Sequence, residues 1–533
     1  MTPIKDYALI GNCETTALIN PEGGIDWLCL PTFDSPSLCA RLLDDEKGGD
    51  FTLRPAGDFE SERAYHEDSA VFVTRFRTPR GVVRLTDFFV TARQVKARFY
   101  DFTSLYPARK LVRLLELEEG GAAVEMELHF RARPDYARTS AAWREEDKGT
   151  FALEAATLFT NASLAVAGDD LLGRFSLPPG EPIFAVLDYG EKRRPADLRQ
   201  VYEWLALTKA FWREWNLFNY YNGPHRALVR RSAVTLKLLS YAATGAFVAA
   251  PTTSLPEGLG GDLNWDYRYT WLRDTALFIQ TLFGLGYSGE ASRFLDFAVR
   301  KWSEDKDRGD DSSLRVLYPI CENPVPPETK LEYLAGYGGS RPVRIGNGAE
   351  DQFQLDNYGH ILLSLFYFRH TGGKIDAQRR QMVEEITAEV IKLWRRDDNG
   401  IWEVREKHAF TYGKIMCWLA LARARDLLGG KNEAIERACA ALQEEIMTHC
   451  LTNENGEQIL SAELNKHTLD ASSFLAFTAG FCRKTSPAPR VSRSRKSWAA
   501  IPWFTAVKAV RKKRARFCFA AFGGSIISSA KAI

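Results

Sequence analysis

The chain has 533 residues, a formal net charge of +2, and a composition of 45% hydrophobic, 26% charged and 12% aromatic residues. This composition indicates a globular protein with a sizeable core and excludes disordered, collagen-like and disulfide-framework proteins. No apolar run is long enough to span a membrane and no secretory leader is apparent, so we expect a cytoplasmic protein with several domains. The nine cysteines are scattered without a Cys-x-x-Cys pair, which predicts neither a zinc site nor disulfides.

The charges are unevenly distributed along the chain. Residues 482–533 contain 13 Lys and Arg but no Asp or Glu, whereas residues 1–481 contain 57 basic and 68 acidic side chains. At the frequency of acidic residues in the body of the chain, a segment of this length would carry about seven. The last 52 residues therefore differ in composition from the acidic body.

The first part of the chain is predicted to be rich in β-strands. Residues 71–76 and 82–89 flank a Pro79-Arg80-Gly81 turn, which is typical of a hairpin. Residues 124–131 alternate between apolar and polar side chains, the period of a strand with one buried face. Because many such short segments are separated by turns, we expect residues 1–190 to form a β-sandwich.

The spacing of apolar residues becomes helical after residue 190. Residues 191–222 are predicted to form a helical linker, and from residue 223 onward apolar side chains recur every three or four positions. Helical stretches alternate with long loops rich in Gly, Pro and Trp, which predicts an α/α barrel over residues 223–481 with its loops at one mouth. A helical-repeat solenoid is the alternative, but the sequence has no fixed repeat period.

Two loops combine aromatic and charged residues in a way that suits a sugar. Residues 264–274 read NWDYRYTWLRD; aromatic faces stack on the C–H groups of a sugar, while Arg and Asp bind its hydroxyls. In residues 397–405, DDNGIWEVR, Glu403 follows Trp402, and desolvation beside an indole raises a carboxyl pKa as a general acid requires. Core packing of the aromatics, helix capping, and a solvated Glu403 paired with Arg405 are the alternatives.

Other motifs add little. Residues 338–359 form a loop shaped by glycines and a proline, which either lines a pocket or only attaches the loop to the barrel. Nucleotide-binding, metalloprotease and serine-hydrolase motifs are absent, and the eight histidines have no ligand-like spacing. We therefore expect no cofactor and no metal site.

Together these segments resemble glycoside hydrolase family 15, which includes glucoamylases and bacterial trehalase-like enzymes. Residues 6–13 (DYALIGNC) and 24–35 (GIDWLCLPTFDS) are similar to the family's trehalase-like N-terminal β-domain. The resemblance extends over residues 1–481, and the barrel motifs follow in the family's order: PTTSLPE at 251–257, NWDYRYTWLRD at 264–274, SRPVRIGN at 340–347, GIWEVR at 400–405 and FTY at 410–412.

The resemblance implies a multidomain β plus all-α protein, with an N-terminal β-sandwich followed by an (α/α)6 barrel. It implies exo-acting hydrolysis of α-glucosides with inversion at the anomeric carbon and without a cofactor. Glu403 matches the family's general acid. The residues expected to bind substrate are Trp265, Asp266, Trp271, Arg273, Asp274 and Trp402. Inversion also requires a second carboxylate about 6.5–9.5 Å from the acid to activate water.

The substrate stays open within this family. An α-glucoside oligosaccharide of the glucoamylase type is expected and trehalose is the alternative, because both present a terminal α-glucose to the same subsite. A non-catalytic sugar-binding protein is an alternative of another class. The basic cluster at residues 511–514 (RKKR) is compatible with a nucleic-acid or anionic-surface binder, which the acidic body disfavours. We expect no nucleic-acid or membrane partner, and the sequence leaves the oligomeric state open.

Residues 482–533 are predicted to be read out of frame, so that the C-terminal part of the barrel and the family's general base are lost. Codons compatible with residues 496–506 and 513–524, shifted by two bases, read ELGGDSLVYR and EGAFLLCSFWW. Both resemble family segments, and the glutamate of the second falls where the family's base lies. A genuine basic tail that binds an anionic surface is the alternative.

Overall fold

The chain folds into two compact units, which are considered separately. The computed structural model describes residues 1–93, 105–154, 156–306, 314–430, 432–454, 457–472 and 481, so the predicted out-of-frame segment lies outside the described residues. Unit 1 contains Met1–Tyr269, Leu285–Glu290 and Pro326–Gly346. Unit 2 contains Thr270–Gly284, Ala291–Val325 and the described residues from Asn347 onward.

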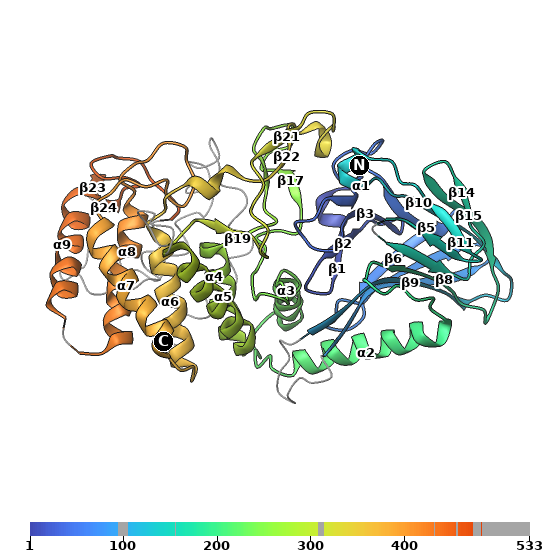
Figure 1. Ribbon diagram of the computed structural model, residues 1–533, viewed down its shortest axis with the longest axis horizontal. Helices are drawn as coiled ribbons and strands as arrows, with labels where there is room; N and C mark the ends of the chain where they lie inside the picture. Colours follow the sequence, from blue (N-terminus) through green and yellow to red (C-terminus); the bar gives the residue numbers. More distant parts are fainter. Residues whose placement is uncertain are drawn as a thin grey trace. The chain divides into compact units, whose positions relative to one another are not determined.

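Two antiparallel sheets make up most of unit 1 (Figure 1). In spatial order the first contains β1 (Ala8–Gly11), β2 (Thr16–Ile19), β3 (Gly24–Cys29), β5 (Asp50–Pro55), β10 (Val124–Arg131), β15 (Asp170–Leu177) and β14 (Ala165–Ala167), with β4 (Ser37–Cys39) beside β3. The second contains β11 (Arg144–Asp147), β12 (Thr150–Ala152), β13 (Thr157–Thr160), β16 (Ile183–Asp188), β9 (Leu105–Glu119), β8 (Gly81–Arg93), β7 (Phe72–Thr78) and β6 (Glu60–Tyr65). The predicted sheet-rich N-terminal region is confirmed.

The core of unit 1 is formed by apolar side chains from both sheets. Along β10 the apolar side chains are buried and the polar ones between them are more exposed, as the alternation predicts. Phe130 of β10 stacks on Phe51 of β5 with ring centroids 4.3 Å apart. Both belong to one cluster with Leu85 and Leu115 of the second sheet. Burying each such side chain contributes about 1.5–3 kcal/mol. Strands β7 and β8 form the predicted hairpin.

Helix α2 (Leu198–Asn216) packs against the second sheet of unit 1 (Figure 1). It begins with a capping box in which the side chains of Asp197 and Gln200 each bond the other residue's backbone N–H. Val201 and Leu205 supply its apolar contacts with the sheet. The remaining elements of unit 1 are η1 (Ile4–Asp6), α1 (Pro134–Ala137), α3 (Arg226–Leu238), β17 (Thr253–Pro256), β18 (Asn264–Asp266), β21 (Thr329–Leu331), η2 (Tyr337–Gly339) and β22 (Val343–Ile345).

Helices dominate unit 2, which confirms the expected helical region after the sheets. In chain order, and largely within this unit, they are α4 (Leu272–Leu285), α5 (Ser288–Lys306), α6 (Asp356–His370), α7 (Ala377–Leu393), α8 (Thr411–Leu428) and α9 (Glu433–His449). The shorter elements are β19 (Thr270–Trp271), β20 (Leu317–Tyr318), η3 (Gly348–Asp351), β23 (Leu451–Glu454) and β24 (Glu457–Leu460). Helix α8 is buried along most of its length and packs against α6, α7 and α9. In the described part of the chain, no helix has the length and apolar character needed to cross a membrane.

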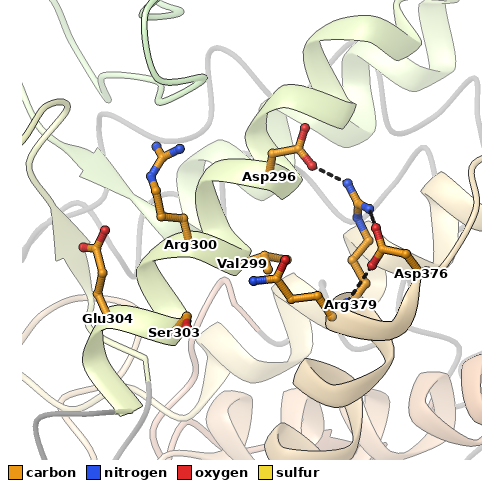
Figure 2. Close-up of a pocket in the computed structure, with 8 residues that line it drawn as sticks. Asp296, Val299, Arg300, Ser303, Glu304, Asp376 and Arg379 are labelled. Atoms are coloured by element: carbon orange, nitrogen blue, oxygen red, sulfur yellow. Dashed lines mark hydrogen bonds and ion pairs between the residues drawn. The ribbon is translucent and has the colours of Figure 1, made fainter.

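A hollow of ≈ 460 Å³ lies between α5 and α7 (Figure 2). Its lining consists of Asp296, Val299, Arg300, Ser303, Glu304, Asp376, Gln378 and Arg379. Figure 2 shows Arg379 between the carboxylates of Asp296 and Asp376, with both of which it forms ion pairs. None of the predicted site residues lines this hollow.

Candidate active site

The first turns of three helices in unit 2 carry the polar residues of the candidate site. Helix α4 follows β19 directly and has Arg273 and Asp274 in its first turn. Helix α6 begins with Asp356, and α8 has Tyr412 as its second residue. Strand β19 is fixed by antiparallel pairing with β20. Because the N-terminal turn of a helix presents unpaired N–H groups and the positive end of its dipole, these positions favour negative charge.

The loop before α8 holds Glu403 in a defined backbone conformation. The backbone N–H of Asp398 donates to the His408 carbonyl oxygen at 2.9 Å, and the N–H of His408 donates to the Asp398 carbonyl oxygen at 2.8 Å. The side-chain amide of Asn399 donates to the carbonyl oxygen of Val404 at 2.8 Å. Glu403 has a φ of 55°, a left-handed conformation that costs a residue with a side chain about 1–2 kcal/mol. Such strain occurs typically at functional positions, where the surrounding hydrogen bonds maintain it.

Three of the predicted site residues meet at one oxygen atom. Trp271 Nε1 donates to Glu403 Oε1 at 2.8 Å, and Arg273 Nη2 donates to the same oxygen at 2.9 Å. Glu403 Oε2 accepts no hydrogen bond from the residues that the structure describes. The side chain of Glu403 is 22% exposed, so it is largely buried and still reaches solvent. One oxygen of Glu403 is therefore fixed by the protein and the other can carry a proton.

The surroundings of Glu403 favour its protonated form. Burial raises the pKa of Glu403 above the ordinary value, while the Arg273 guanidinium and the Trp271 N–H act in the opposite direction. Asp274 also raises this pKa through its negative charge. A carboxyl with this balance suits general acid catalysis near neutral pH.

Arg273 is bonded to protein groups through both of its Nη atoms. Nη1 donates to the Ile401 carbonyl oxygen at 3.1 Å and to Gln354 Oε1 at 3.2 Å. Nη2 lies 3.1 Å from Asp274 Oδ2 in addition to its bond with Glu403. Arg273 therefore joins the start of α4 to the loop that carries Glu403, and it orients two carboxylates at once.

Trp402 is held by a carboxylate that the sequence reasoning missed. Its Nε1 donates to Asp470 Oδ2 at 2.8 Å, and the other oxygen of Asp470 accepts from the backbone N–H of Ser472 at 2.8 Å. No local pattern points to this pair, because 68 positions separate the two residues. Asp470 thus fixes the orientation of the indole ring next to Glu403.

Three further polar residues of the site also have no assigned role from sequence. His360 Nε2 lies 3.0 Å from the Tyr412 hydroxyl oxygen and 3.7 Å from Asp356 Oδ2. Burial lowers the pKa of His360 to about 3, so its imidazole is neutral. Burial raises the pKa of Asp356 to about 6 and that of Asp398 to about 8. Residues 354–360 are recognisable in the sequence as a polar segment, but the sequence does not show that this segment contacts Arg273, as it does through Gln354.

The other two predicted substrate residues belong to unit 1. Asp266 is fully buried and accepts hydrogen bonds from Arg268 at 2.8 and 2.7 Å and from Tyr269 at 3.2 Å. The Trp265 ring faces the Arg344 guanidinium, 4.4 Å from the ring centroid. A role for Trp265 and Asp266 in binding substrate stays a prediction. In both units, the described residues include no cluster of three or more side chains suited to hold a metal ion.

Two family models match the chain. The model for glycosyl hydrolases family 15 matches residues 223–501, and the model for a trehalase-like N-terminal domain matches residues 1–157. The chain belongs to glycosyl hydrolase family 15. The family resemblance of the sequence is thereby confirmed, and the chain is a glycosidase by family.

Trehalases from several organisms are similar to this family member over most of its length. The trehalase of Mycolicibacterium smegmatis is 33% identical, over 92% of this chain and 76% of the relative. The trehalase of Mycobacterium tuberculosis is 32% identical, over 92% of this chain and 74% of the relative. The trehalase of Thermoplasma volcanium is 33% identical, over 84% of this chain and 70% of the relative. Among solved structures, a wild-type glycosidase has a TM-score of 0.35 at 19% identity, over 51% of this chain and 67% of the other. A putative kojibiose phosphorylase from the human microbiome has a TM-score of 0.42 at 9% identity, over 82% of this chain and 66% of the other.

Proposed function

We propose that the active site of this chain is built to hydrolyse trehalose, in which two glucose units are joined through their anomeric carbons. The relatives that extend over most of the chain are trehalases, and the N-terminal match is to a trehalase-like domain. These similarities support trehalose better than the glucoamylase-type oligosaccharide that the motifs first favour. The single observation that carries the catalytic proposal is the Glu403 carboxyl, fixed through one oxygen and bonded by no described residue at the other.

Glu403 acts as the general acid in this proposal. Its protonated carboxyl gives a proton to the glycosidic oxygen as the bond from that oxygen to C1 breaks. A water molecule adds to C1 from the opposite face and loses a proton to a base, so that one β-glucose and one α-glucose leave. Burial of Glu403 supports this role because it raises the pKa of the carboxyl above its ordinary value, the direction that a general acid requires.

Asp274 and Trp402 bind the glucose unit that is attacked. The carboxylate of Asp274 is 28% exposed and can accept hydrogen bonds from sugar hydroxyls. The indole of Trp402 offers an aromatic face to the C–H groups of the ring. Because both Nη atoms of Arg273 are bonded to protein groups, Arg273 orients Asp274 and Glu403 rather than serving as the main sugar ligand.

The fold in this proposal is a β-sandwich over residues 1–190, a helical linker over 191–222 and an incomplete (α/α)6 barrel over 223–481. The helices α4 to α9 supply three of the six helix pairs, and the close packing of α6 against α8 supports an inner ring. Residues 482–533 are read out of frame, so the barrel lacks its last helices and its general base. The absence of Asp and Glu from this segment supports the change of frame.

Resequencing of the gene between the codons for Ala479 and Arg490 tests the change of frame. A missing or extra base is expected there. The family model matches as far as residue 501, which is 20 residues into the segment predicted to be out of frame. The DNA sequence decides the reading frame independently of this match. An intact frame, together with glucose release by the 533-residue chain at the rate of its relatives, would contradict the loss of the base.

Glucose release from trehalose, maltose and isomaltose tests the substrate. The frame-restored protein should act fastest on trehalose, and the 533-residue chain should be slower by at least about 10²-fold, the scale of general base catalysis. Faster release from maltose or isomaltose would contradict the assignment to trehalose. It would favour hydrolysis of an α-glucoside oligosaccharide of the glucoamylase type instead.

A further inference from the structure

Two glutamines, Gln352 and Gln354, connect Arg273 to the backbone of Glu403, and the proposed reaction assigns them no role. Arg273 Nη1 donates to Gln354 Oε1 at 3.2 Å. Gln354 Nε2 donates to Gln352 Oε1 at 3.3 Å, and Gln352 Nε2 donates to the carbonyl oxygen of Glu403 at 3.1 Å. Arg273 Nη2 donates to Glu403 Oε1 at 2.9 Å, so these four hydrogen bonds form a closed ring that begins and ends at Glu403.

The backbone around Phe353 explains why both glutamines reach the same loop. Gln352 is extended, with a φ of −81° and a ψ of 156°, and in an extended segment residues two positions apart lie on one face. The Phe353 N–H donates to Asn399 Oδ1 at 3.0 Å, and the Phe353 carbonyl oxygen accepts from the Asn399 N–H at 2.9 Å. The segment is thereby attached to the loop that carries Glu403.

The two ends of this chain of hydrogen bonds determine the orientation of both amides. A guanidinium only donates, so Gln354 must turn Oε1 towards Arg273. A carbonyl oxygen only accepts, so Gln352 must turn Nε2 towards the backbone of Glu403. The Nε2 of Gln354 and the Oε1 of Gln352 then meet as donor and acceptor. A flip of either amide would bring two donors or two acceptors together, so one arrangement alone satisfies the ring.

A neutral amide suits the position of Gln354 because it binds Arg273 without neutralising its charge. The other acceptor of the same Nη1 atom is also neutral, a backbone carbonyl oxygen 3.1 Å away. The charges that act on Glu403 come from Arg273 and Asp274 on α4 and from Asp356 on α6. Arg273 is the cation among them, and its contact of 2.9 Å with Glu403 depends on how its guanidinium is held.

We propose that Gln352 and Gln354 are positioning residues for the acid of the reaction, and that their ring holds Arg273 Nη2 against Glu403 Oε1. Gln354 is 3% exposed and is bonded through both atoms of its amide, so it acts through Arg273 and does not touch the sugar. Gln352 holds the carbonyl group of Glu403, whose backbone is left-handed. The ring therefore fixes the side chain and the backbone of the acid together. This inference rests on the role of Glu403 in the proposed function and adds the residues that hold it in place.

Trp271 supplies a reporter of Glu403 in the 533-residue chain that needs no turnover. Its indole N–H donates to Glu403 Oε1, so its NMR resonance in protein with isotope-labelled tryptophan should move as Glu403 loses its proton. Trp271→Phe identifies this resonance. Gln354→Met and Gln352→Met break the ring and keep the length of the side chain. With Arg273 less firmly held, the ionised form of Glu403 is less stabilised, so the pH midpoint of the movement should rise by about half a unit or more.

Gln280→Met is the matched control for the loss of an amide. Gln280 lies on α4, as Arg273 does, and is half-buried, and its Nε2 has no hydrogen-bond partner among the described residues. This variant should leave the midpoint where it is in wild type. An unchanged midpoint in either ring variant, or an equal shift in Gln280→Met, overturns the proposal.

The wild-type chain itself keeps the inference testable if the methionine variants do not fold. Ionisation of Glu403 changes the pull on Arg273 and polarises the hydrogen bonds behind it. Two glutamine side-chain amide resonances should therefore move with the same midpoint as the Trp271 indole, and neither should move in Glu403→Gln. The absence of such amide resonances overturns the proposal. Failure of the chain to hydrolyse trehalose would contradict the proposed function and would leave both measurements unaffected.

Discussion

The indole Nε1 of Trp271 donates a hydrogen bond of 2.8 Å to Glu403 Oε1, although 132 positions separate the two residues in the chain. Arg273, two positions further along, donates to the same oxygen at 2.9 Å. Both donors come from the junction of β19 and α4. This junction therefore selects Oε1 as the oxygen of Glu403 that the protein holds, which leaves Oε2 to carry the proton in the proposed reaction.

Trp271→Phe tests this selection, because it removes the N–H donor and keeps an aromatic ring. The lost hydrogen bond stabilises the ionised form of Glu403, so its removal raises the pKa of Glu403 further. The limb of the pH–rate profile on which the acid loses its proton should then move to higher pH. The measurement is kcat/KM for trehalose from pH 5 to pH 9 in the frame-restored enzyme.

Trp302→Phe is the control for lost packing. Trp302 is also buried, and its Nε1 has no hydrogen-bond partner among the described residues. This variant should lose stability without a change in the pH profile. If both variants shift the profile equally, the hydrogen bond of Trp271 is not what tunes Glu403.

Asp274→Asn tests the proposed sugar contact. The amide keeps the size of the side chain but removes the charge that receives sugar hydroxyls and the Arg273 guanidinium. Because charge-assisted hydrogen bonds contribute about 1.5–3 kcal/mol, KM for trehalose should rise by roughly tenfold or more. The thermal midpoint should change little, since Asp274 is half-buried. A large fall in the midpoint with an unchanged KM would mean that Asp274 is structural only.

The bond between Trp402 and Asp470 predicts a pair of binding results. Asp470→Ala removes the acceptor that holds the indole, and a hydrogen bond to a charged group is worth about 1.5–3 kcal/mol. Trehalose affinity, measured by calorimetry with Glu403→Gln as the common background, should weaken by roughly tenfold. Asp470→Asn keeps an acceptor oxygen and should bind nearly as well as the background protein. Equal weakening in both variants would show that the charge of Asp470 matters and the orientation of Trp402 does not.

Most of the secondary structure could be predicted because it follows local periodicity. The alternation along β10, the hairpin of β7 and β8, and the helical stripe of α2 each follow from residues within a dozen positions of one another. The pairing of distant strands could not be predicted in this way. Strand β10 lies between β5 and β15, and only the packing of both sheets on one core decides this order.

Residues of the candidate site could be predicted only where residues adjacent in the sequence form a recognisable pattern. Glu403 was singled out by its neighbour Trp402, and Arg273 by its neighbour Asp274. Asp470 gave no comparable signal, because its contact with Trp402 is long-range. Asp356 lies in the loop of residues 338–359 that the sequence singles out, but the sequence does not show which charged residues act on it. The sugar contact expected of Arg273 stays a prediction, and nothing in the sequence showed that the fold engages both of its Nη atoms with protein groups.

The stereochemistry of trehalose hydrolysis, followed by proton NMR with the frame-restored enzyme and its Glu403→Gln variant, tests the central claim most directly. The enzyme should release α- and β-glucose in equal initial amounts, as inversion at one anomeric carbon requires. Glu403→Gln should lose at least about 10²-fold in turnover of trehalose and much less with a nitrophenyl α-glucoside, whose leaving group needs no proton. Release of α-glucose alone, or an unchanged rate of trehalose hydrolysis in the variant, would contradict the account.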